Sequence, residues 1–237
     1  MNWQNAITDF QLFLKIERGL STNTIESYSR DLNKLLQFLE TNEIDLSPIA
    51  IDENTVQQFI YEIAKKVAVR SQARIIAGLR SFFDYLIFED YRVTNPTDLI
   101  ETPKLGLKLP DTLSTSEIDA LIDAIDLSHP QGERNKAMLE IMYSCGLRVS
   151  ELTSLKISDL FFEEGFIRVI GKANKQRFIP IHVTTQKLIN GYEIHFRNRI
   201  KPNKGFEDTL FLNRRGNGLS RQMVFMVLKK LAINIGL

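Results

Sequence analysis

The most informative part of the chain runs from Met138 to Pro180 and reads MLEIMYSCGLRVSELTSLKISDLFFEEGFIRVIGKANKQRFIP. An apolar helical pattern ends near Gly146, because glycine is poor inside a helix and common where one ends. A second helical pattern begins at Val149. Two β-rich runs follow, at 166–170 and 178–181, with a cationic turn-type segment between them. This stretch therefore predicts two helices followed by a β-hairpin.

Two cations in this stretch are candidate anion ligands. Arg148 follows the helix break among apolar neighbours, where a guanidinium is costly unless it meets an anion. Lys172 lies in the cationic turn with Lys175 and Arg177, which favours a phosphate as that anion. There are plainer alternatives: Arg148 pairs with Glu151 across one helical turn, and Lys172 is an ordinary solvated turn lysine. Spacing alone leaves these alternatives open.

The string GLRVSEL, followed by a short strand and then GKANKQRFIPI, resembles the catalytic domain of the tyrosine site-specific recombinases (the phage integrase family) and most closely its Xer branch. The similarity continues from the first helix to the last residue. Arg148 matches the family's first catalytic arginine, and Lys172 matches the lysine of the catalytic hairpin. The resemblance implies DNA strand cleavage and rejoining through a 3′-phosphotyrosyl intermediate, without a metal or other cofactor. In that chemistry a guanidinium stabilises charge on the phosphate, and the lysine protonates the departing 5′-oxygen.

The family's remaining motifs are a His-x-x-Arg pair, a further His or Trp, and the nucleophilic tyrosine. The histidines of this chain are His129, His182 and His195, and none begins His-x-x-Arg. The last tyrosine, Tyr192, lies on a predicted helix well before the family's nucleophile position, so we interpret it as structural. We therefore expect a catalytic domain that is incomplete at its C-terminus, and we expect the 237 residues alone to be inactive.

Three functional interpretations follow. The first is a Xer-type recombinase, which by resemblance resolves chromosome dimers at cell division with a sister recombinase, in a tetrameric synapse regulated by a DNA translocase. Within the family, a phage or transposon integrase is the alternative to a Xer recombinase. The second interpretation is a non-catalytic DNA-binding remnant or regulator. The third is a helical interaction protein unrelated to DNA. The first two predict salt-sensitive binding to a DNA duplex, and only a longer chain could form a covalent DNA adduct.

The chain is predicted to form two domains, mainly α-helical with a small β-sheet. Residues 1–94 carry four amphipathic helical patterns with short connections, which indicates a small bundle, and the resemblance makes it a SAM-like core-binding domain. Residues 95–112 contain three prolines and no steady period, so we predict a linker. Residues 113–237 are the predicted α+β catalytic domain, with a three-stranded patch around 160–181.

Further DNA contacts are predicted on basic and polar side chains outside the two catalytic positions. A solvated face is the alternative for the fourth helix, but the family's core-binding domain uses corresponding helices against the major groove. The predicted contacts are Arg70, Gln72, Arg74 and Arg80 on that helix, Lys175 and Arg177 on the hairpin, and Arg221 on the last helix.

The composition is ordinary for a globular protein, with 43% hydrophobic and 25% charged residues. The single cysteine, Cys145, excludes an intrachain disulfide, and no apolar run or N-terminal pattern indicates a membrane span or signal peptide, so we predict a cytoplasmic protein. The net charge is +1, yet residues 1–164 carry 16 Lys and Arg against 26 Asp and Glu, whereas residues 165–237 carry 14 against 3. This asymmetry predicts a basic surface for a polyanion in the C-terminal part.

Overall fold

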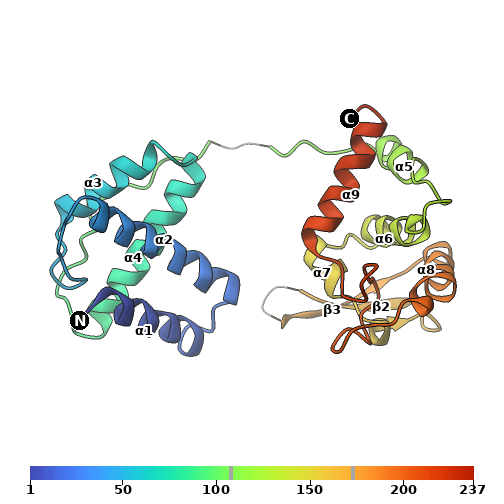
Figure 1. Ribbon diagram of the computed structural model, residues 1–237, viewed down its shortest axis with the longest axis horizontal. Coiled ribbons are helices and arrows are strands. Elements are labelled where there is room, and N and C mark those ends of the chain that lie inside the picture. The colour runs from blue at the N-terminus through green and yellow to red at the C-terminus, as the bar shows by residue number, and fades with distance from the viewer. Residues whose placement is uncertain (107–108, 172–173) are drawn as a thin grey trace. The chain divides into compact units, whose positions relative to one another are not determined.

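The computed structural model describes residues 1–106, 109–171 and 174–237, and the chain divides into two units, Met1–Leu109 and Pro110–Leu237 (Figure 1). Both units are mainly helical, and the second also holds a small antiparallel sheet. The predicted fold class is therefore confirmed. Lys172, the predicted catalytic lysine, lies outside the described residues.

The first unit is a helical bundle, and its first three helices begin at a polar residue whose side chain caps the helix. Asn2, Ser21 and Asp52 each accept a hydrogen bond at a helix start from the backbone N–H three residues on. In the core between the helices, the ring of Phe10 packs edge-on against Phe82, with centroids 5.4 Å apart. The helices are α1 Trp3–Ile16, α2 Thr22–Thr41, α3 Glu53–Ala64 and α4 Val69–Phe88.

The segment that follows α4 packs back onto the first unit. Ile100 belongs to the hydrophobic core of the bundle, and both Asn95 and Thr97 are buried. The side-chain carbonyl of Asn95 accepts hydrogen bonds from the N–H and the hydroxyl of Thr97, at 2.9 and 2.7 Å. The predicted linker 95–112 therefore begins with residues that are part of the bundle, because their polar groups find partners there.

The second unit packs helices against one face of the sheet. The strands follow the order β1-β2-β3, and all pairs are antiparallel. Ile167 and Val169 of β2 are buried on the helical side, together with Met138 of α6 and Tyr192 of α8. The elements are α5 Thr115–Asp123, α6 Gly132–Ser144, α7 Val149–Ser154, β1 Leu160–Phe161, β2 Phe166–Ile170, β3 Gln176–Pro180, α8 Val183–His195 and α9 Arg221–Asn234, with 3₁₀ turns at Ile157–Asp159 and Arg197–Arg199.

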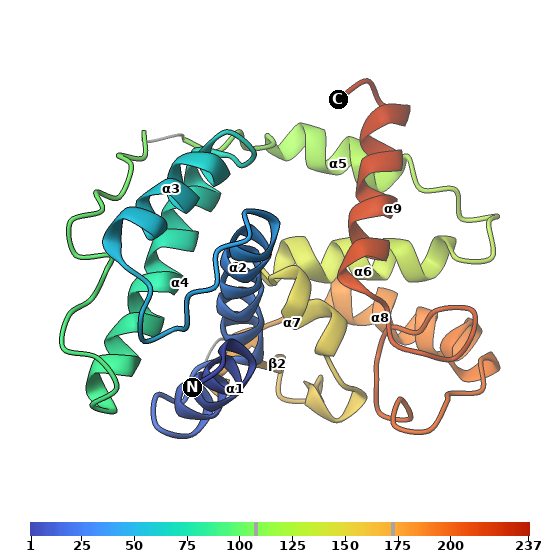
Figure 2. The ribbon, with the colours of Figure 1, turned by 60° about the vertical axis from the view of Figure 1, so that its left-hand side comes forward.

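Helices α6 and α8 lie side by side, and α9 contacts both α5 and α7 (Figure 2). In the order of the chain, the antiparallel hairpin of β2 and β3 comes after α7 and leads directly into α8. Among the described residues, every helix is too short or too polar to span a membrane.

Candidate active site

Arg148 lies where the chain turns out of α6 and into α7. Gly146 makes this turn with a φ of +58°, a left-handed conformation that glycine adopts at little cost. The neighbouring side chains of Leu147 and Leu152 are buried, whereas the side chain of Arg148 is 72% exposed. The predicted apolar setting of Arg148 is therefore wrong. Its apolar neighbours turn into the core, and the extended backbone at Arg148 turns the guanidinium toward solvent.

The buried charge at this site belongs to Glu151, whose side chain is only 2% exposed. Arg148 donates its backbone N–H to Oε2 and its Nη1 to Oε1, both at 2.9 Å. Arg177 donates to both oxygens in a bidentate arrangement, Nη1 to Oε1 at 2.7 Å and Nη2 to Oε2 at 2.8 Å. The hydrogen bond from Arg177, helped by those from Arg148, outweighs burial and lowers the pKa of Glu151 from an ordinary 4.5 to about 2.

The register of the β-hairpin explains how Arg177 reaches α7. Arg177 is the cross-strand partner of Val169, whose side chain is buried, so the arginine points to the helical side of the sheet. Gly171 leaves the necessary room, since a Cβ at this position would lie 3.3 Å from both Arg177 Nη1 and Glu151 Oε1. The pairing of Arg148 with Glu151, one of the alternatives from sequence, is confirmed. The second arginine on the same carboxylate was not predicted.

The predicted DNA contacts on α4 lie in different environments. Arg74 is ion-paired with the fully buried Asp31 of α2, and Arg80 donates to two backbone carbonyls of the segment after α4, at 3.0 and 3.4 Å. Both arginines therefore hold the bundle together. Arg70 is exposed and Gln72 is half-buried, and the side chains of both lack a hydrogen bond within the described residues.

The other candidates lie in the second unit. Lys175 is exposed on the hairpin, and Arg221 is exposed in the first turn of α9. Tyr192 is a core residue: its hydroxyl donates to the carbonyl of Leu210 at 3.3 Å and accepts the N–H of Leu212 at 3.1 Å. The structural interpretation of this tyrosine is confirmed. Within the described ranges, no three His, Cys, Asp or Glu side chains gather in a metal-binding arrangement.

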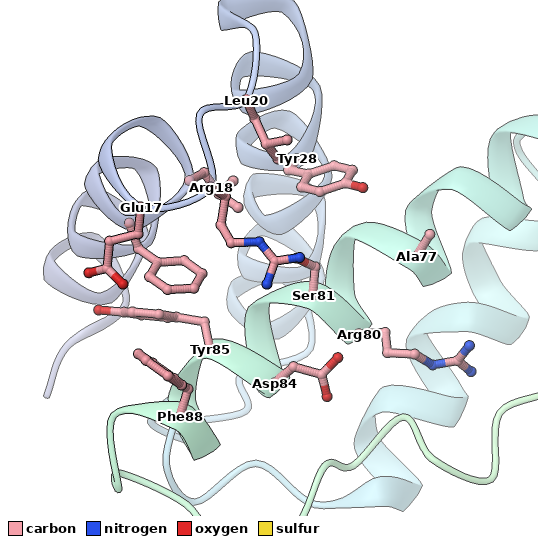
Figure 3. Close-up of a pocket in the computed structure, with 12 residues that line it drawn as sticks. Glu17, Arg18, Leu20, Tyr28, Ala77, Arg80, Ser81, Asp84, Tyr85 and Phe88 are labelled. Carbon is pink, nitrogen blue, oxygen red and sulfur yellow. The ribbon is translucent and has the colours of Figure 1, made fainter.

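A cleft of about 710 Å³ lies within the first unit, between α1, the start of α2, and α4. Figure 3 shows Arg18 extending across this cleft, with Tyr85 along one wall. Burial, together with nearby carboxylates, raises the pKa of Tyr85 to about 12. Two charged residues that line the cleft already have structural partners. Asp84 accepts a hydrogen bond from the side-chain amide of Asn95 at 2.7 Å, and Arg80 donates to backbone carbonyls. We therefore assign no catalytic role to this cleft.

Comparison with known proteins connects this geometry to a family. Residues 7–90 match the model of the phage integrase N-terminal SAM-like domain, and residues 111–237 match that of the phage integrase family. The chain belongs to the phage integrase family of tyrosine recombinases. Within this family it is 40% identical to tyrosine recombinase XerD of Listeria innocua, over 98% of this chain and 79% of that protein. It is 39% identical to XerD of Oceanobacillus iheyensis, over 98% of this chain and 78% of that protein. The resemblance to the Xer branch is confirmed.

Two solved tyrosine recombinase structures show that the fold is shared as well. The XerH recombinase bound to a palindromic difH substrate, in a post-cleavage complex, superposes with a TM-score of 0.73 at 21% identity, over 97% of this chain and 68% of that one. A λ integrase tetramer bound to a Holliday junction superposes with a TM-score of 0.75 at 18% identity, over 100% and 67% of the two chains.

Proposed function

We propose that this chain binds a duplex recombination site and acts in Xer-type chromosome dimer resolution, by strand cleavage and rejoining through a 3′-phosphotyrosyl intermediate. The main support is the state of Arg148, whose guanidinium is held at one nitrogen by a buried carboxylate and is otherwise exposed. Its remaining donors make no hydrogen bond in the described part of the chain, so they can engage the oxygens of a phosphate.

The charges around Glu151 favour an anion at this place. Arg148 and Arg177 together carry two positive charges, and the ionised Glu151 between them carries one negative charge. The cluster therefore keeps one excess positive charge, and Arg148 is its more exposed cation, at 72% against 38% for Arg177. Such a fixed donor stabilises the extra charge that develops on a phosphate in the transition state. Lys172 is our proposed general acid, and Lys175 is a proposed phosphate contact on the same hairpin.

The nucleophile is a separate question. Tyr192 is excluded as a nucleophile because its hydroxyl is buried and bonded on both sides. We propose that these 237 residues supply DNA binding and phosphate activation, and that they form no covalent adduct with DNA on their own. A non-catalytic DNA-binding remnant or regulator is the second candidate function; it shares the DNA binding and differs in the absence of strand cleavage.

We propose the partners from the relatives. The λ integrase tetramer on a Holliday junction supports a four-protomer synapse for this chain. A sister Xer recombinase would complete that synapse, and a DNA translocase would regulate it. A phage or transposon integrase remains the alternative within the family.

The proposal is tested by DNA binding. We expect the chain to bind a ~40-bp duplex at about 50 mM salt, with an affinity that falls steeply as salt rises. Arg148→Ala should reduce the slope of log Kd against log salt by about 1, as expected for one lost phosphate contact, whereas Lys229→Ala on α9 should leave it unchanged. Absence of duplex binding by the unaltered chain would refute the proposed function. A covalent adduct with a nicked duplex would refute the inference about the nucleophile.

A further inference from the structure

Two loops of the second unit, residues 201–204 and 213–217, are fastened to each other, and we call them the paired loops. The backbone N–H of Asn203 donates to the carbonyl of Gly216 at 2.9 Å, and its side-chain amide donates to two further acceptors of the second loop, at 2.9 and 2.8 Å. Gly216 has a φ of +79°, and a Cβ there would lie 2.3 Å from the carbonyl oxygen of Lys201. Only glycine at position 216 therefore allows the paired loops to approach each other this closely.

The paired loops carry a group of exposed cations without counter-charges. None of these side chains forms an ion pair or a hydrogen bond within the described residues. The backbone beneath the second loop is already fixed, since the side chain of Asn213 accepts the N–H groups of residues 215 and 217 at 2.8 and 3.2 Å. The cations are Lys201 and Lys204 in the first loop and Arg214 and Arg215 in the second.

The carboxylates nearest in sequence are occupied elsewhere. Glu207 accepts the backbone N–H of Gly205 at 2.8 Å, and Asp208 accepts the N–H and the hydroxyl of Ser158 at 3.0 and 2.7 Å. Asp208 also lies 3.9 Å from the ammonium group of Lys156. Neither carboxylate forms an ion pair with a cation of the paired loops within the described residues.

The paired loops are distinct from the Arg148 site. Leu212, at the base of the second loop, has its carbonyl bonded by Nη1 of the buried Arg134, at 3.3 Å. Arg134 lies in the first turn of α6, whereas Arg148 comes after its last residue, Ser144, which is about 15 Å farther along the helix.

We propose that the paired loops bind the sugar–phosphate backbone of duplex DNA, as a second contact of this unit apart from the Arg148 site. The proposal rests on the proposed function, because it requires that the chain binds a duplex. A duplex carries about one negative charge per 1.7 Å of its axis, so cations fixed on one surface can neutralise several successive phosphates. Contacts of this kind fix the position of the protein and read no base sequence. An acidic protein is the competing partner for such a surface, and the experiment separates the two.

The test compares two pairs of adjacent, exposed cations in the same unit. Arg214→Gln/Arg215→Gln removes two charges from the paired loops, and Lys229→Gln/Lys230→Gln removes two from α9. Kd is measured against salt on two ~40-bp duplexes of unrelated sequence. We expect the first variant to reduce the salt slope by about 2 on both duplexes, and the second to leave it unchanged. Arg214→Lys/Arg215→Lys should retain the slope, since a point charge suffices for a phosphate.

Three results would overturn the proposal. An unchanged slope in the Arg214→Gln/Arg215→Gln variant would mean that the paired loops do not touch DNA, and an acidic protein would then be the better partner. An equal fall in both Gln variants would mean that only net charge matters. Absence of duplex binding by the unaltered chain would refute this inference together with the proposed function, whereas the first two results would leave the proposed function intact.

Discussion

Replacing Glu151 by glutamine tests whether this carboxylate stabilises the second unit through its charge. The two arginines lower its pKa from 4.5 to about 2, and each pKa unit corresponds to about 1.4 kcal/mol, so the charged form contributes about 3 kcal/mol to folding. Because the pKa is lower in the folded state, this stabilisation is complete above about pH 5. It is lost as the pH falls toward 2 and the carboxylate is protonated.

We therefore expect Glu151→Gln to lower the free energy of unfolding by about 3 kcal/mol at neutral pH, and by only about 1.4 kcal/mol at pH 3. The assay is urea unfolding followed by far-UV circular dichroism across this pH range. Trp3 is the single tryptophan and is buried in the first unit, so its fluorescence reports that unit and should be unaffected. Glu163→Gln, at an exposed position between β1 and β2, is the matched control. A destabilisation of equal size at both pH values would refute the electrostatic reasoning, because a packing defect does not titrate.

Two further substitutions test other parts of the structure. Gly216→Ala should lower the Tm more than Gly205→Ala, because both positions have a positive φ but only the first Cβ would clash with backbone, 2.3 Å away; equal losses in calorimetry would contradict this. Asp31→Asn should destabilise the first unit by about 1–3 kcal/mol, because it removes the buried partner of Arg74; an unchanged urea transition of Trp3 fluorescence would show that the ion pair contributes nothing.

The helices could be predicted because their signals are local. Asp52, for example, is a polar residue directly before an apolar periodic run, and it caps α3 as the pattern indicates. The segment after α4 shows where such signals fail. Asn95 and Thr97 lie in a polar, proline-containing stretch typical of a linker, yet they are buried because they satisfy each other's hydrogen bonds. A polar stretch of sequence therefore predicts exposure only where the fold offers its polar groups no hydrogen-bond partner.

The candidate site could be predicted only in part, because one of its contacts is local in the sequence and the other is not. The spacing of Arg148 and Glu151 gives their contact, since the side chain three residues after an N-cap can reach back to it. The place of Arg177 depends on the register of β2 against β3, in which Arg177 is opposite Val169; the sequence pattern predicts the hairpin but not this register. Similarly, Arg74 and Arg80 fit a polar helix face, but their partners are distant in sequence.

The contacts at α7 order the exposed guanidinium of Arg148 before any ligand binds. An exposed guanidinium on a flexible side chain loses conformational entropy when it binds a phosphate. At Arg148 the backbone N–H and one guanidinium nitrogen are both held by Glu151, so part of that ordering is present before any ligand arrives. Arg177, on β3, in turn keeps Glu151 ionised and holds its carboxylate in place. The buried ion pair therefore fixes the exposed cation, and this preorganisation is what stabilisation of a developing phosphate charge requires.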